Sequence, residues 1–237
     1  MLQKAIDYLL HLRDVEKFEF NGHQYTNKQL VRVPGDEPKV FQTKTLASMV
    51  ELILKESGHD KLNDLIVHVE SPTKVNVVTT LRGDFERYGL YSAVAELPRI
   101  PLDSYMDLEG MVILLKSAFV HSDMRDELIK TLGNVKEEAV KTSTDDGVSQ
   151  SVVAKVGIGL QGNVKLPPIV KLIPYRTFIE VEQPEGEFLL RLQQGPNAAL
   201  FEADGGAWKL QARKNIAQYF HDALGELIGV GKVIVTE

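Results

Sequence analysis

The sequence has no cysteine, a single tryptophan and no long uninterrupted hydrophobic run. Without cysteine, the chain can form neither disulfides nor thiolate nucleophiles, and it cannot bind zinc or iron–sulfur clusters through sulfur. Its apolar segments are interrupted by charged residues well before the ~20 residues that a membrane-spanning helix requires. These absences favour a soluble protein of a reducing compartment, which we expect to be the cytoplasm.

An excess of basic charge is also absent. Lysine and arginine together number 27 against 33 acidic residues, so the formal net charge is −6. A chain with this balance has no general attraction to nucleic acid or to anionic lipid, and neither is an expected partner. The first 17 residues mix charged and apolar side chains, which is typical of an amphipathic helix and not of a signal peptide.

The chain has 237 residues, of which 43% are hydrophobic and 25% charged, as in ordinary globular proteins. Apolar spacing predicts helices over residues 2–10, 46–54, 104–132 with a bend at 121–123, and 210–228. Thr45 is the expected N-cap of the second helix, and Gly58 its stop. An Asn21-Gly22 turn predicts an early hairpin. Alternating patterns predict strands over residues 64–70, 73–81, 87–97, 151–159, 167–175, 177–183, 187–194, 197–203 and 232–237.

These elements predict an α+β fold, with mixed or antiparallel sheets built from hairpins and about three or four amphipathic helices. Residues 133–150 are polar and lack a core-forming pattern, so we interpret them as a loop. This loop would divide the chain into an N-terminal α+β region, 1–132, and a β-rich region, 151–237, that ends in a helix and a strand. The same elements are compatible with one integrated domain.

Five charged residues form the first candidate site. On strands, Glu202 and Asp204 would share one face, and so would Arg176, Glu180 and Glu182. If the two strands are neighbours, their carboxylates could hold Mg²⁺ or Mn²⁺. The alternative, which we favour, is a ladder of cross-strand ion pairs without metal.

The sequence Phe201-Glu-Ala-Asp-Gly-Gly-Ala-Trp208 joins the last predicted strand of this region to a helix. Gly205 and Gly206 suit a tight turn that needs positive φ, and Trp208 suits an apolar anchor. We therefore predict a structural junction at Gly205, Gly206 and Trp208.

Three basic residues follow the glycines and form the second candidate site. Lys209, Arg213 and Lys214 lie near a helix start, where backbone N–H groups can bind phosphate, and aromatic neighbours could stack on single-stranded nucleic acid. No Walker or dinucleotide-binding motif accompanies them. A solvated helix face is the interpretation that we favour.

Other catalytic patterns are weak or missing. The histidines are scattered without metal-ligand spacing, and neither a Gly-x-Ser-x-Gly nor a His-Glu-x-x-His motif occurs. Glu37-Pro38-Lys39 matches a bare nuclease pattern but lies in a proline-rich segment. We therefore predict neither an enzyme nor a cofactor; only the hydrolase alternative would require Mg²⁺ or Mn²⁺.

Several ordered sequence segments resemble one family. They are Asp145 to Gln150, Pro174 to Phe178 with Glu180, Val181, Gln183 and Pro184, Phe188 to Arg191, and Leu200 to Lys209. Together they are similar to the YfdQ-like family of phage and prophage proteins, a family of unknown function. The resemblance covers most of the chain, is densest from Asp145 to Ile216, and departs at Gly186, where a serine is expected. It implies a phage or prophage gene whose product acts inside a bacterial cell, and it supplies no reaction, cofactor or catalytic residue.

The sequence thus predicts a non-enzymatic interaction or assembly protein that forms a homo-oligomer in the host cytoplasm. Its partner would be itself, or a host or phage protein, because predicted hairpins and amphipathic helices offer edges and faces to share. The alternative is an accessory protein of phage DNA metabolism or a metal-dependent hydrolase that uses the acidic residues.

Overall fold

The computed structural model describes residues 3–6, 15–20, 23–26, 38–57, 64–82, 85–135, 144–145, 150–156, 160–167, 169–193, 195 and 197–237. Contacts divide the chain into two units, Met1–Glu37 and Pro38–Glu237. Helices occur together with parallel and antiparallel strand pairs, so the predicted α+β class is confirmed.

The first unit contains the predicted hairpin. Strands β1 (Lys17–Phe20) and β2 (His23–Thr26) pair antiparallel, with Phe20 opposite His23. This register leaves Asn21 and Gly22 between the strands, although these two residues lie outside those described. Of the predicted first helix, residues 3–6 are described and are helical.

The second unit contains a five-stranded sheet in the order β14-β4-β5-β6-β3. Its strands are β3 (Phe41–Thr43), β4 (Leu65–Ser71), β5 (Lys74–Thr79), β6 (Gly89–Val94) and β14 (Val233–Thr236). The central strands β4, β5 and β6 pair antiparallel, as successive hairpins do, whereas β3 and β14 add to the edges in parallel. The chain's last strand therefore completes a sheet of its own unit.

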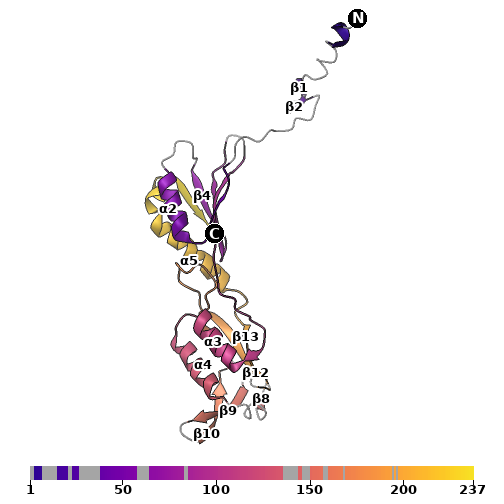
Figure 1. Ribbon diagram of the computed structural model, residues 1–237. Helices are drawn as coiled ribbons and strands as arrows, with labels where there is room; N and C mark the ends of the chain where they lie inside the picture. The colour runs from indigo at the N-terminus through magenta and orange to yellow at the C-terminus, as the bar shows by residue number, and fades with distance from the viewer. Residues whose placement is uncertain are drawn as a thin grey trace. The chain divides into compact units, whose positions relative to one another are not determined.

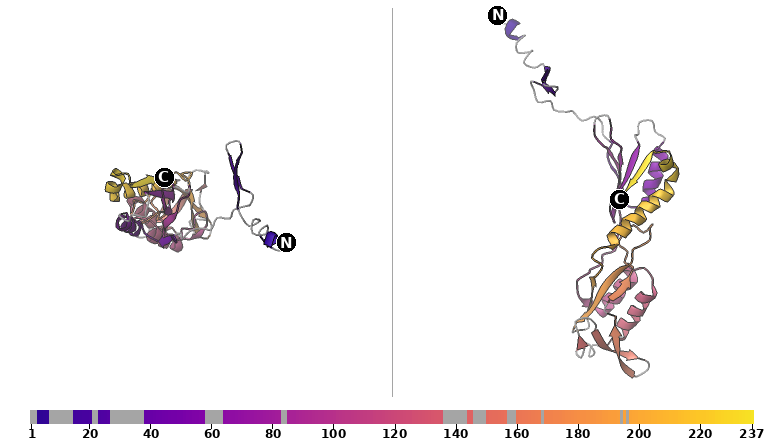
Figure 2. Two further views of the ribbon diagram at one scale, coloured as in Figure 1. Left: turned by 90° about the horizontal axis from the view of Figure 1, so that it is seen from above. Right: turned by 180° about the vertical axis from the view of Figure 1, so that it is seen from behind.

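One face of this sheet is covered by helices (Figures 1 and 2). Helices α2 (Leu46–Glu56) and α5 (Trp208–Ala223) pack their buried residues against alternate positions of the strands, such as Val67 and Val77. Short helix α6 (Gly225–Gly229) follows α5. Thr45 caps α2 as predicted, because its hydroxyl accepts a hydrogen bond from the Ser48 N–H. Gly58, the predicted stop, lies outside the described residues.

A second core forms on an antiparallel four-stranded sheet, in the order β11-β12-β13-β7. Its strands are β7 (Met106–Asp107), β11 (Ile169–Leu172), β12 (Gly186–Gln193) and β13 (Asn197–Glu202). Helices α3 (Leu108–Ala118) and α4 (Asp123–Asn134) lie on one face and bury side chains that include Phe119, Phe188 and Leu200 (Figure 1). Each core takes residues from both sides of the expected boundary at 133–150.

Each sheet has a second face, opposite the one on which its described helices pack, and we call this its open face. On the five-stranded sheet, pairing aligns Ile234, Ile66 and Val78, and Ile234 is 48% exposed. On the four-stranded sheet, pairing aligns Ile169 with Leu189 and Leu189 with Phe201. Because side chains alternate between the faces of a strand, these residues point away from the helices. Each sheet therefore presents a row of apolar side chains on its open face.

A third, three-stranded sheet has the order β10-β9-β8. Its strands are β8 (Thr144–Asp145), β9 (Gln150–Val156) and β10 (Leu160–Leu166). Strand β10 was not predicted, because Gly162 and Asn163 interrupt its apolar pattern. Part of the expected loop is ordered in β8, while residues 136–143 and 146–149 lie outside those described.

The two longest predicted helices were only partly right. The helix expected over 104–132 is two helices, because Phe119 is extended, at φ −125° and ψ 141°, and pairs with Pro174. The helix expected over 210–228 begins earlier, at Trp208, and is interrupted at Leu224, which leaves the helical conformation. Within the described residues, no helix has both the length and the hydrophobicity needed to cross a bilayer.

The break between α3 and α4 depends on capping by Ser122, whose hydroxyl accepts a hydrogen bond from the Arg125 N–H at 3.2 Å. Ser122→Ala should lower the free energy of unfolding by about 1 kcal/mol, because it leaves this N–H without its cap. The control is Ser117→Ala, a matched change inside α3 that should be close to neutral. Chemical denaturation measures the free energy of unfolding of each variant. Equal effects of the two substitutions would contradict the capping role.

Candidate functional site

The segment predicted as a strand over 177–183 is a loop between β11 and β12, and the prediction was wrong. The buried side chain of Gln183 closes this loop from inside. Its Oε1 accepts hydrogen bonds from the backbone N–H groups of Arg176 (3.0 Å) and Thr177 (3.1 Å), and its Nε2 donates to the Phe178 carbonyl (2.9 Å). The backbone of this segment thus bonds to the side chain of Gln183 and not to a neighbouring strand. The segment is not part of a sheet, so its side chains do not alternate between two sheet faces.

The predicted group of four carboxylates is consequently divided. Glu180 lies at the N-terminus of α2, where its Oε1 accepts hydrogen bonds from the backbone N–H of Leu46 (2.8 Å) and of Ala47 (3.5 Å). The Glu182 carbonyl accepts a hydrogen bond from Asn215 Nδ2 at 2.9 Å. The Glu180 carboxylate is therefore engaged at the N-terminus of α2, where it also stabilises the positive end of the helix dipole, whereas Glu182 contacts α5 through its backbone.

Glu202 and Asp204 are brought together, but around Arg176. The guanidinium is buried, with the residue 8% exposed; its Nη1 donates to Glu202 Oε1 at 3.0 Å, and its Nη2 lies 3.7 Å from Asp204 Oδ2. Burial lowers the pKa of Arg176, and the two carboxylates oppose that shift. Across the described residues, no three histidine or acidic side chains are grouped as a metal site would require. A cation of the protein itself lies between the carboxylates that were considered as metal ligands.

Aromatic rings complete the surroundings of Arg176. The guanidinium carbon lies 4.1 Å from the centroid of the Trp208 ring and 5.7 Å from that of Phe188. Stacking of this kind is favourable because the ring faces carry partial negative charge. A Cβ on Gly186 would overlap Arg176 Nη2, so the close approach explains why glycine occupies this position.

The stretch from Phe201 to Trp208 forms the turn between β13 and α5. Gly205 and Gly206 have φ of +62° and +79°, in the left-handed region that favours glycine. The Gly206 N–H donates to Asp204 Oδ1 at 2.9 Å, and α5 begins at Trp208. Asp204 thus contacts both the turn and Arg176. Sequence reasoning found these residues but assigned no structural role to Gln183, because its neighbours Glu182 and Pro184 give no sign that its side chain is buried.

The three basic candidates lie in the first turns of α5. Lys209 Nζ is 5.9 Å from the Trp208 ring centroid, Arg213 is partly buried and Lys214 is exposed. A cavity of about 470 Å³ adjoins Trp208, and its charged lining consists of Lys171, Glu185, Glu187 and Asp204. Carboxylates outnumber the ammonium group here, so the electrostatics oppose an anionic ligand at this helix start.

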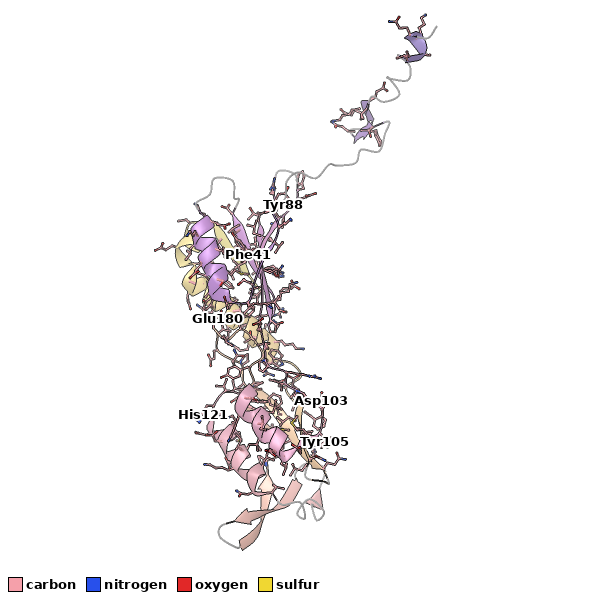
Figure 3. All side chains as sticks on the ribbon, in the orientation of Figure 1. Phe41, Tyr88, Asp103, Tyr105, His121 and Glu180 are labelled. Carbon is pink, nitrogen blue, oxygen red and sulfur yellow. The ribbon has the colours of Figure 1, made fainter. Side chains whose placement is uncertain are left out.

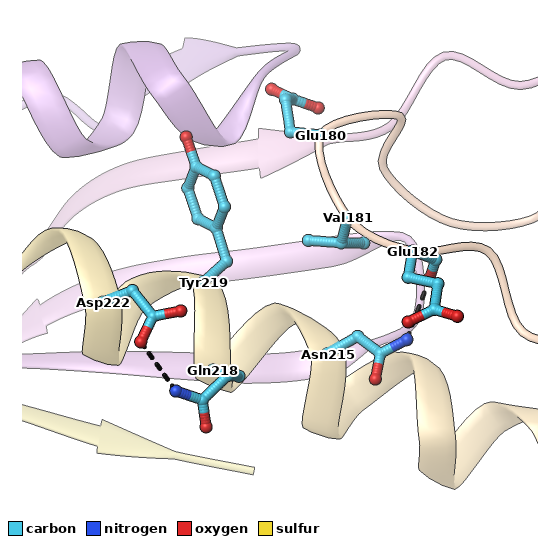
Figure 4. A pocket seen from close by; sticks show the side chains of 7 residues that line it. All are labelled: Glu180, Val181, Glu182, Asn215, Gln218, Tyr219 and Asp222. Carbon is cyan, nitrogen blue, oxygen red and sulfur yellow. Dashed lines mark hydrogen bonds between the residues drawn. The ribbon is translucent and has the colours of Figure 1, made fainter.

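A smaller cavity of about 240 Å³ lies between the loop and α5 (Figure 4). Glu180 and Glu182 line one side, whereas Asn215, Gln218, Tyr219 and Asp222 come from the helix. The Gln218 Nε2 donates to Asp222 Oδ1 at 2.7 Å. Burial, together with the charge of Glu180, raises the pKa of Tyr219. This acidic lining suits a cationic group better than an anionic one. It was not predicted, because its two sides are separated by more than thirty residues of sequence.

Comparison of the chain with protein-family models, curated proteins and solved structures found no match.

The cluster around Arg176 predicts a strong dependence of stability on the guanidinium. Arg176→Met should lower the free energy of unfolding by about 3–5 kcal/mol, because it leaves the carboxylates of Glu202 and Asp204 without their partner. Chemical denaturation measures the loss. Arg99→Met, the same change at an exposed position, is the control and should alter stability by no more than about 0.5 kcal/mol. Similar losses in the two variants would show that the cluster contributes nothing to stability.

The turn after β13 predicts that substitutions of Gly205 lower stability to different extents. A Cβ at this position would meet no atom within 4 Å, so only backbone conformation is tested. Gly205→Val should lower stability by about 1–3 kcal/mol, because a β-branched residue is strained at positive φ. Gly205→Asn should cost clearly less, since asparagine adopts this conformation more readily. Melting temperatures compare the variants, and an equal loss for both would contradict the backbone explanation.

Proposed function

We propose that the protein is a non-catalytic assembly protein that acts by binding copies of itself. The observation that supports this proposal is the open face of each sheet, where apolar side chains form a row across adjacent strands. Ile169, Ile234 and Tyr105 expose 49%, 48% and 46% of their surface. Contiguous apolar residues on an uncovered sheet face are typical of interaction surfaces, because association removes them from water.

The hydrolase alternative has less support. Of its proposed ligands, Glu180 lies at the N-terminus of α2 and Glu182 lies beside α5, while a guanidinium neutralises Glu202 and Asp204 in the Arg176 cluster. A cation at the same place would have to displace Arg176, which also stacks on Trp208. We therefore favour assembly over metal-dependent chemistry.

The resemblance to the YfdQ-like family supports a proposal about the biological setting. We infer that the gene belongs to a phage or prophage and that the assembled protein acts in the cytoplasm of the bacterial host. A phage or host protein is a further candidate partner. These inferences depend on the sequence segments from Asp145 to Ile216, and the assembly proposal stands independently of them.

Self-association predicts a molar mass well above that of one chain, 26.5 kDa. Light scattering behind a sizing column, at several protein concentrations, should give a multiple of this mass. The melting temperature should be unchanged by Mg²⁺ or Mn²⁺, since a cation that bound only the folded protein would raise it. A monomer at all concentrations would refute assembly, and metal-dependent stabilisation would instead favour the hydrolase alternative.

A further inference from the structure

The open face of the four-stranded sheet combines apolar and charged side chains in an ordered pattern. We use the name outer sheet face for the side chains of Tyr105, Ile169, Glu187, Leu189, Arg191 and Phe201. Helices α3 and α4 pack on the opposite face, with the buried residues Phe188, Leu190 and Leu200 between the two layers. The outer sheet face is thus the side of this sheet that its own helices leave uncovered.

Apolar residues cross the middle of the outer sheet face. Cross-strand pairing places Ile169 beside Leu189 and Leu189 beside Phe201. Tyr105, labelled in Figure 3, packs edge-on against Phe201, with ring centroids 6.2 Å apart at an interplanar angle of 70°. Ile169 and Tyr105, at the two ends of this row, are each about half exposed. The row therefore ends in accessible apolar surface on both sides of Leu189.

Charges of opposite sign flank the apolar row along β12. Its outward residues are, in order, Glu187, Leu189, Arg191 and Gln193, because successive side chains alternate between faces. Lys171 pairs in register with Glu187, and its Nζ lies 4.0 Å from Glu187 Oε1. An acidic and a basic position thus lie at equal distances on either side of a central leucine.

This order is self-complementary under only one of the two simple symmetries. If two outer sheet faces meet with their β12 strands antiparallel, Leu189 faces Leu189 of the second copy, and Glu187 faces its Arg191. If the strands run parallel, like charges oppose each other, which is unfavourable. Antiparallel packing also keeps each strand opposite its own copy, so Ile169 meets Ile169 and Phe201 meets Phe201.

We propose that the outer sheet face binds the outer sheet face of a second copy, with a two-fold axis at Leu189 perpendicular to the strands. The proposal rests on the assembly function and names the surface responsible for it. A second copy is the occupant that the charges favour, since a face with acid, leucine and base in this order is complementary to itself. Such an interface is isologous: the same residues contribute from both chains.

Charge reversal tests the pairing of Glu187 with Arg191. Glu187→Arg and Arg191→Glu should each raise the dissociation constant of the pair about tenfold or more, because each variant creates two like-charge contacts. The double variant Glu187→Arg/Arg191→Glu should restore association, since it inverts both partners. Glu70→Arg is the matched control on the open face of the five-stranded sheet, where Lys74 neighbours Glu70 as Lys171 neighbours Glu187. Light scattering gives the masses, and circular dichroism checks that every variant is folded.

The absence of cysteine permits a second, positional test. Leu189→Cys introduces a single thiol on the proposed axis. Packed sheets lie about 10 Å apart, too far for a disulfide, so a short bismaleimide is the suitable probe. Leu189→Cys should crosslink rapidly into a covalent dimer. Ile234→Cys, on the open face of the other sheet, should not.

The outcomes separate the interface from the function. Loss of association in both single charge variants, with recovery in the double variant, supports the outer sheet face. An assembled protein whose mass responds only to Glu70→Arg, or which crosslinks through Ile234→Cys, overturns the proposed interface and leaves the assembly function standing. An assembled protein that none of the substitutions affects also overturns the interface. A monomeric wild-type protein overturns both.

Discussion

The burial of one guanidinium constrains a large part of the second unit. The loop that carries Arg176 leaves β11 and returns to β12, both in the core of the four-stranded sheet, yet its residues Phe178 and Val181 belong to the core of the five-stranded sheet. The backbone of the loop is therefore not stabilised by pairing with a neighbouring strand. Gln183 satisfies its backbone from within, and Arg176 fixes its start to β13 and α5 through Glu202, Asp204 and Trp208. A buried charge is costly unless it is paired, so these partners depend on one another.

Periodic segments of the fold could be predicted from the sequence. Strands β4, β5, β6 and β14 of the five-stranded sheet and helix α2 have regular apolar spacing together with clear turn or capping residues, and local rules were enough to find them, whereas the three-residue strand β3 was too short to show a pattern. A bend at 121–123 was expected, but the full break between α3 and α4 could not be found in this way. Phe119 keeps the apolar period of α3, and only its pairing with Pro174, fifty-five positions later, draws it into an extended conformation.

The candidate site shows the same limit. Asp204, Gly205 and Gly206 are neighbours in sequence, and their turn was predictable because the glycine pair requires a special backbone conformation. The loop from Thr177 to Gln183 alternates like a strand, and periodicity alone cannot distinguish a partner strand from a buried glutamine side chain. The carboxylate of Glu180 instead accepts hydrogen bonds at the N-terminus of α2. The position of Glu180 depends on hydrogen bonds to residues far away in the sequence, and such bonds cannot be inferred from one sequence.

The position of Trp208 has a practical consequence. It is the chain's only tryptophan, and its ring lies against Arg176 at the point where the loop, β13 and α5 meet. Tryptophan fluorescence of the whole protein is therefore emitted from this one place. A fluorescence spectrum recorded during unfolding follows the local surroundings of Arg176, whereas circular dichroism averages over all helices and strands. Comparing the two signals would reveal whether the meeting point separates before the cores do, with no label added to the chain.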